Sequence, residues 1–98
     1  MTAKISVSQN GIASVSGDLT FSTVTALCED IPNCFQEADI FKVDLSGVKT
    51  CDSASLVLLV MIIRFFTQQQ KNVVFTKLPA TILTLIKLYN LKNLITVN

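Results

Sequence analysis

Apolar and polar residues alternate in runs that predict strands and helices along the chain. Two short β-prone stretches, Ile5–Val7 and Ile12–Val15, lie on either side of Gln9-Asn10-Gly11. An Asn-Gly pair between two such stretches is a strong local signal for a β-hairpin. The first part of the chain, up to Gly17-Asp18, is therefore expected to form an antiparallel pair of strands.

Apolar residues at helical spacing follow the predicted hairpin. They are Val24, Leu27, Cys28, Ile31 and Phe35. Ser22 or Thr23 is expected to cap this helix, because a side-chain oxygen there can accept a backbone N–H that the first turn leaves unpaired. Pro32 falls inside the pattern and should kink or divide the helix.

The middle of the chain predicts a strand and then a long helix. Ile40–Leu45 is mostly apolar and is expected to lie centrally in the sheet, with a loop at Ser46-Gly47. Asp52 is the expected N-cap of a helix that runs from about Ser53 to Gln70.

The last part of the chain predicts one more strand and one more helix. Val73–Thr76 is the strand, and Pro79 suits the first turn of a helix that continues to Tyr89. Asn90 is the candidate C-cap. Leu94–Val97 is expected to be a last short strand or a frayed tail.

This order of elements predicts a single α/β domain over residues 1–98. Two strand–helix–strand units favour parallel strand pairs joined by right-handed crossovers. A chain of 98 residues, 50% of them hydrophobic, is long enough for one core, and no linker or low-complexity stretch divides it.

The composition excludes most common kinds of catalytic site. The sequence contains no His, so a His general base, a Ser-His-Asp triad and a His-rich metal site are excluded. Cys28, Cys34 and Cys51 match neither a CxxC pair nor the spacing of a zinc site. We interpret the three thiols as small core residues, and we expect no metal, no cofactor and no enzymatic activity.

Charge is distributed unevenly along the chain. Residues 1–52 hold all seven acidic residues and three Lys, whereas residues 53–98 hold five cations and no acid. The second half is therefore a candidate electropositive face. The cations form no dense patch and no aromatic residues are interleaved with them, so nucleic acid is not an expected partner.

The sequence also limits how the protein can meet a membrane. The longest apolar run, Leu56–Ile63, has eight residues, whereas a membrane-spanning helix needs about 20. Residues 1–5 show no secretory signal, so a reducing cytoplasm is the expected compartment. Because no strongly basic amphipathic helix is present, membrane attachment is expected only through partner proteins.

The long helix has apolar residues on two faces. Its broad face, expected to cover the sheet, holds Ala54, Leu58, Leu59, Ile62, Ile63, Phe65 and Phe66. The opposite face holds Ser53, Val57, Val60, Arg64 and Lys71, with Met61 and Gln68 beside them. Apolar side chains rimmed by polar groups are typical of an interaction surface. The alternative is a helix that its own domain packs on both sides.

Ser53 combines a hydroxyl with the start of this helix. Unpaired N–H groups and the helix dipole favour an anion there, so a phosphate on Ser53 would be tolerated and would place negative charge on the apolar stripe. Ser53 is therefore a candidate phosphorylation site, or simply a small polar residue that starts a helix. Asp52 is interpreted as a cap and not as a catalytic base.

Two segments of the sequence resemble the central signature of STAS domains: Val43-Asp44-Leu45-Ser46-Gly47-Val48 and Cys51-Asp52-Ser53-Ala54-Ser55-Leu56. Asn72-Val73-Val74-Phe75 and Leu85-Ile86-Lys87-Leu88-Tyr89-Asn90-Leu91 are similar to the MlaB-like branch of this family. The resemblance implies an α/β STAS-type fold: a mixed sheet of four to five strands with about three to four helices, packed mainly on one side.

The resemblance also implies a function. MlaB-like proteins are non-enzymatic subunits that bind the ATPase of a phospholipid ABC transporter, which maintains outer-membrane lipid asymmetry in Gram-negative bacteria. The protein would then be cytoplasmic, peripheral to the inner membrane through the transporter, and without a small-molecule substrate. Asp52, Ser53 and Leu56 match signature positions, and Ser53 matches the hydroxyl residue at the ATPase contact. The expected ATPase-binding residues are Asp52, Ser53, Leu56, Val57, Val60, Met61 and Arg64.

A second function is open from the same resemblance. In anti-sigma factor antagonists the residue that matches Ser53 is a phosphorylation site, so the protein could be a regulatory phosphoswitch. Ala54 and Ser55 depart from the family pattern, because relatives usually carry at least one Gly there. The missing Gly should stiffen the turn, which disfavours recognition by a kinase more than static docking.

Overall fold

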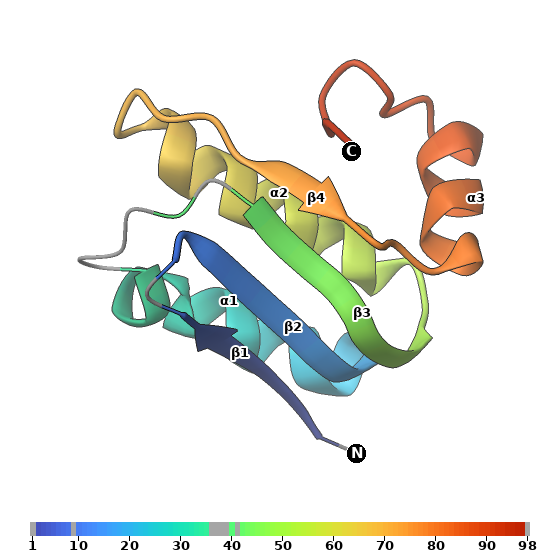
Figure 1. The fold of residues 1–98 in the computed structure, drawn as a ribbon. Helices are drawn as coiled ribbons and strands as arrows, with labels where there is room; N and C mark the ends of the chain where they lie inside the picture. Colours follow the sequence, from blue (N-terminus) through green and yellow to red (C-terminus); the bar gives the residue numbers. More distant parts are fainter. Residues whose placement is uncertain (1, 9, 36–39, 41, 98) are drawn as a thin grey trace.

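A four-stranded mixed sheet is backed by helices (Figure 1). The structure is a computed structural model that describes residues 2–8, 10–35, 40 and 42–97. The elements are β1 (Ala3–Val7), β2 (Ile12–Leu19), α1 (Phe21–Phe35), β3 (Lys42–Cys51), α2 (Ala54–Thr67), β4 (Val74–Thr76) and α3 (Ala80–Leu88). Gln9 of the predicted turn and Phe41 of the predicted central strand lie outside the described residues.

The strands lie in the order β1-β2-β3-β4. β1 and β2 form the predicted antiparallel hairpin, with Ile5 opposite Val15. β2 with β3 and β3 with β4 are the predicted parallel pairs. Figure 1 shows α1 and α2 side by side behind the sheet, and α3 beyond β4. The expected mixed α/β sheet, with helices mainly on one side, is confirmed.

The core lies between the sheet and the two long helices. Its largest buried side chains include Val15, Leu45 and Phe75 from the strands and Leu58, Leu59, Ile62 and Phe66 from α2. The rings of Phe35 and Phe66 meet edge to face, with centroids 5.2 Å apart, and so join α1 to α2. Burial of each such side chain contributes about 1.5–3 kcal/mol. The predicted core face of the long helix is confirmed, although Ile63 and Phe65 are only half-buried.

The predicted cap of α1 is wrong by at least two residues. The helix begins at Phe21, so Thr20 occupies the capping position. The backbone N–H of Thr20 donates to the hydroxyl of Thr23 at 3.1 Å, which reproduces one half of a capping box. Pro32 does not divide the helix, which continues to Phe35.

The expected loop at Ser46-Gly47 is also wrong, because β3 continues through it to Cys51. The parallel register between β2 and β3 shifts between Ser14 and Ser16, so the strand absorbs an irregularity where a loop was predicted. The strands approach closely there, since a Cβ built on Gly47 would lie 2.8 Å from the Cβ of Ser16. Gly47 therefore allows β2 and β3 to approach each other closely at this position.

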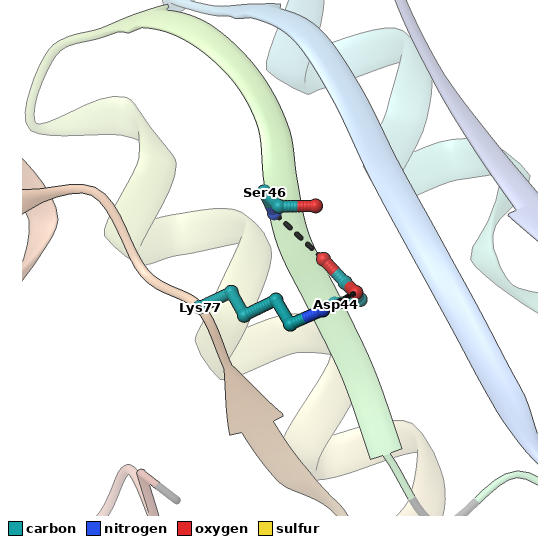
Figure 2. Close-up of polar contacts among 3 residues, drawn as sticks. All are labelled: Asp44, Ser46 and Lys77. Carbon is teal, nitrogen blue, oxygen red and sulfur yellow. Dashed lines mark hydrogen bonds and ion pairs between the residues drawn. The ribbon is translucent and has the colours of Figure 1, made fainter.

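Asp44 stabilises this irregular strand from its exposed face (Figure 2). Its carboxylate accepts the backbone N–H of Ser46 at 2.7 Å and lies 3.7 Å from the ammonium of Lys77. The hydrogen bond from Ser46, assisted by the nearby Lys77, lowers the pKa of Asp44 below its ordinary value.

The two remaining ends differ slightly from the predicted ones. α2 covers Ala54–Thr67 and is followed by Gln70 with φ of 61°. After α3, Asn90 adopts φ of 57° beyond the C-cap residue Tyr89. The segment predicted as a strand or tail makes a single parallel bridge from Val97 to Phe75. Within the described residues, no helix has the length and apolar character needed to cross a bilayer.

Candidate functional site

The turn between β3 and α2 carries the candidate hydroxyl. The backbone N–H of Asp52 donates to the carbonyl of Leu19 at 3.0 Å, which holds the turn against the end of β2. The carboxylate of Asp52 accepts the backbone N–H of Ala54 at 2.8 Å. Asp52 thus caps the helix as the sequence predicts, because a cap side chain pairs with an N–H that the first turn leaves open.

Ser53 is the first residue with helical backbone angles after this cap. Its φ of −63° and ψ of −17° place it at the N-terminal end of α2, and its hydroxyl makes no capping hydrogen bond. The side chain is half-buried. A hydroxyl that the helix does not use can therefore meet another molecule at this position.

A contact between two strand ends supports the turn. The hydroxyl of Thr50 in β3 donates to the carboxylate of Asp18 in β2 at 2.6 Å. The two residues are 32 positions apart in the sequence, so the hydrogen bond closes the sheet just before Asp52 and Ser53. Sequence reasoning missed this pair, because only the parallel register of β2 and β3 brings it together.

Ser53 and the outer face of α2 form what we call the docking stripe: Ser53, Val57, Val60, Met61 and Arg64. Val57 is 52% exposed and Met61 is 37% exposed. Arg64 is exposed as well, whereas Val60 is half-buried and packs against the core. Packing by the rest of the described domain therefore leaves Val57 and Met61 uncovered.

Leu56 lies apart from the other residues predicted at this site. It is only 7% exposed and belongs to the hydrophobic core. Leu56 lies in the first turn of α2 and packs into the core, whereas Val57 beside it is exposed. We therefore leave Leu56 out of the docking stripe and assign it to the packing of α2.

A shallow groove of about 210 Å³ extends the stripe toward α1. Met61 and Arg64 form its α2 side, and Cys28, Ile31 and Pro32 form its α1 side. Sequence reasoning missed this groove, because it exists only once the two helices lie side by side. Pro32 helps to form the rim, although its ring was expected to interrupt the helix.

The three thiols lie at the boundary of the core. Cys28, Cys34 and Cys51 are free and half-buried, and each packs against the core. Burial raises the pKa of each thiol, so the reactive thiolate is disfavoured at neutral pH. Nowhere in residues 2–8, 10–35, 40 and 42–97 do three potential metal-ligating His, Cys, Asp or Glu side chains gather.

Comparisons with known proteins give one matching family model and several solved structures with a similar fold. The family model described as "Mlab, STAS domain" matches residues 5–96. No curated protein matches the sequence. The unphosphorylated form of the anti-sigma factor antagonist SpoIIAA is similar in structure, with a TM-score of 0.72 at 10% identity over 99% of this chain and 88% of that one.

Two further solved structures are similar. A proposed anti-sigma factor antagonist from Thermotoga maritima has a TM-score of 0.77 at 14% identity, over 97% of this chain and 84% of that one. The phosphorylated form of the Bacillus cell fate determinant SpoIIAA has a TM-score of 0.68 at 10% identity, over 99% of this chain and 91% of that one. Identities this low establish a shared fold and nothing finer.

Proposed function

The chain belongs to the STAS domain family, and on that premise we propose that it is a non-enzymatic subunit that binds the ATPase of an ABC-type phospholipid transporter. STAS domains act as regulatory or accessory modules that bind other proteins. The matching family model is the MlaB-like one, which supports the transporter branch. The protein would then reside in the cytoplasm and be held at the inner membrane by the transporter. Its role would be to help maintain the lipid asymmetry of the outer membrane.

The exposure of Val57 carries this proposal. A β-branched apolar side chain that is 52% exposed, on a helix whose other face packs against the core, leaves apolar surface in water. Met61 lies one turn further along the same face. A partner that covers both side chains would gain about 1 kcal/mol from each, since complete burial of such a side chain is worth about 1.5–3 kcal/mol.

Polar residues lie at both ends of the docking stripe and can fix the orientation in which the partner binds. Ser53 is small, so the partner backbone can approach the start of α2 closely. Arg64 stands at the other end, and its guanidinium can form two parallel hydrogen bonds with a carboxylate on the ATPase. An apolar centre between polar ends is the usual composition of a protein interface.

The chemistry of the chain supports an accessory role. The sequence has no His, and burial raises the pKa of all three thiols, so the chain offers neither a general base of that kind nor an activated thiolate. Asp52 is committed to the helix cap. Surface complementarity is therefore the property through which this domain would act.

Co-purification with the tagged ATPase tests the proposal. Val57→Glu and Ser53→Glu should each lose the ATPase, because a charge would be buried without a partner at the contact. Leu94→Glu is the matched control, since Leu94 is 47% exposed and lies outside the docking stripe. Circular dichroism and urea unfolding verify that all three variants fold. Retention of the ATPase by folded Val57→Glu would contradict the proposal.

A regulatory phosphoswitch is the second candidate, and one observation favours it. The hydroxyl of Ser53 is half-buried at the start of α2 and makes no capping hydrogen bond, so it could receive a phosphate. An anti-sigma factor kinase would then be the partner, and phosphorylation would release it. Mass spectrometry after incubation with such a kinase distinguishes the two functions, because a phosphate on Ser53 would support the switch.

A further inference from the structure

A second surface feature lies away from the docking stripe. A groove of about 670 Å³ lies between α3 and the C-terminal tail, residues 89–97. Leu83, Ile86 and Lys87 line it from α3, and Lys92, Ile95 and Val97 line it from the tail. Figure 1 shows the tail curving back beside α3 near β4. We call this feature the tail groove, and its volume lies in the range of small-molecule sites.

Backbone hydrogen bonds within the chain hold the two sides of the tail groove in place without a ligand. The N–H of Leu91 donates to the carbonyl of Ile86 at 2.9 Å, and that of Asn90 donates to Lys87 at 3.1 Å. Together with the positive φ of Asn90, these bonds form a Schellman motif that turns the chain back on α3. The N–H of Ile95 then donates to Leu91 at 3.0 Å and closes the next turn.

The far end of the tail is attached to the sheet. The N–H of Phe75 in β4 donates to the carbonyl of Thr96 at 2.9 Å, next to the bridge between Phe75 and Val97. Both walls of the groove are thus fixed to the fold. A ligand would find the groove already formed and would not have to order it on binding.

The lining of the tail groove is mostly apolar. Ile86 and Ile95 are buried and form part of the hydrophobic core at its base. Leu83 and Val97 stand on opposite walls, and each is 42% exposed. An alkyl chain that covers these side chains would remove exposed apolar surface from water, which is the dominant favourable contribution to binding of this kind.

The polar part of the lining consists of two threonines, Thr84 and Thr96, and two lysines. Lys87 and Lys92 are exposed and lie on the two sides of the groove. Within the part of the chain that the structure describes, neither has an ion-pair partner, in contrast to Lys77, which pairs with Asp44. Among the described residues, no acidic side chain lines the groove, and the sequence has no Asp or Glu in residues 53–98. The field at the groove therefore favours an anion.

From this combination we propose that the tail groove binds a single-chain anionic amphiphile, the chemistry shared by fatty acids and single-chain phospholipids. Its alkyl chain would lie over Ile86 and Ile95 between Leu83 and Val97, and its head group would lie between Lys87 and Lys92. The described lining residues include no His, Cys, Asp or Glu, so the proposal is that of a ligand and not of a substrate. The proposal does not depend on the docking stripe, because the two surfaces share no residue.

Titration of the isotope-labelled protein with dodecyl phosphate, kept below its critical micelle concentration, tests the proposal by nuclear magnetic resonance. Saturable backbone shifts are expected in α3 and residues 91–97. Inorganic phosphate supplies the head group alone and dodecyl maltoside the chain alone, and each should bind at least about tenfold more weakly. Equally tight binding of either probe, or shifts spread along α2, would overturn the proposal.

Paired variants separate a specific site from general charge attraction. Lys87→Gln with Lys92→Gln should weaken dodecyl phosphate about tenfold. Lys4→Gln with Lys49→Gln removes the same charge elsewhere and should leave the affinity unchanged. Leu83→Gln should weaken binding, whereas Val7→Gln in β1, where Val7 is 39% exposed, should not. If both charge pairs have equal effects, the attraction is non-specific and the proposal is wrong.

Discussion

The carboxylate of Asp52 lies 2.8 Å from the backbone nitrogen of Ala54 and accepts its N–H, so a residue of the turn caps the helix that carries the docking stripe. The same residue is bound to β2 through its own N–H, which donates to Leu19 at 3.0 Å. Asp52 therefore fixes both the start of α2 and its position relative to the sheet.

Asp52→Ala should lower the free energy of unfolding by about 1 kcal/mol, because the N–H of Ala54 loses its partner at the helix start. Asp52→Asn should recover most of the loss, since an amide oxygen can accept the same hydrogen bond. Urea denaturation of the three proteins provides the measurement. Equal stability of the Ala variant and the wild type would contradict the capping role.

Ser55→Ala should stabilise the protein. The hydroxyl of Ser55 is fully buried and has no hydrogen-bond partner among the described residues, so its desolvation is not compensated. Replacing it with a hydrogen should raise the free energy of unfolding by about 1 kcal/mol. Ser14→Ala, at an exposed position of β2, is the control and should change it by less than about 0.5 kcal/mol. A less stable Ser55→Ala variant would indicate a partner for the hydroxyl.

Acid should weaken the contact between Asp44 and Ser46. The hydrogen bond holds the pKa of Asp44 below its value in the unfolded chain, so the stabilisation is complete above the ordinary Asp pKa of about 3.9 and is lost as pH falls through the lowered value. Urea unfolding at stepwise lower pH should therefore show a smaller decrease in stability for Asp44→Asn than for the wild type. Identical pH profiles would contradict this role.

Gly47→Ala should destabilise the sheet by about 1–3 kcal/mol, because the new methyl group would lie 2.8 Å from the Cβ of Ser16. The double variant Gly47→Ala with Ser16→Gly removes the opposing atom and should recover part of the loss. A double-mutant cycle measured by thermal unfolding gives the coupling between the two positions. Additive effects would show that the close approach does not matter.

Local patterns in the sequence predicted much of this fold. Asn10-Gly11 indicates the hairpin because its turn chemistry is short-range, and Pro79 and Asn90 lie at the two ends of α3 for the same reason. The exposure of Val57 could also be predicted, because helical periodicity separates it from the core face of α2.

Features that depend on tertiary contacts could not be predicted. Ser46-Gly47 looks like a loop until β2 approaches it, and the hydrogen bond between Asp18 and Thr50 needs the parallel register. The tail groove depends on the path of the chain after Asn90; this residue indicates where α3 ends, but no pattern in residues 91–97 indicates that the tail returns to Phe75.

The affinity of the ATPase for the Val57→Ala, Met61→Ala double variant tests the central claim most directly. Isothermal titration calorimetry should give a Kd at least about tenfold higher than that of the wild type, because the partner would lose the apolar centre of the contact. Leu94→Ala should bind as the wild type does. An unchanged Kd for the folded double variant would contradict docking through the outer face of α2.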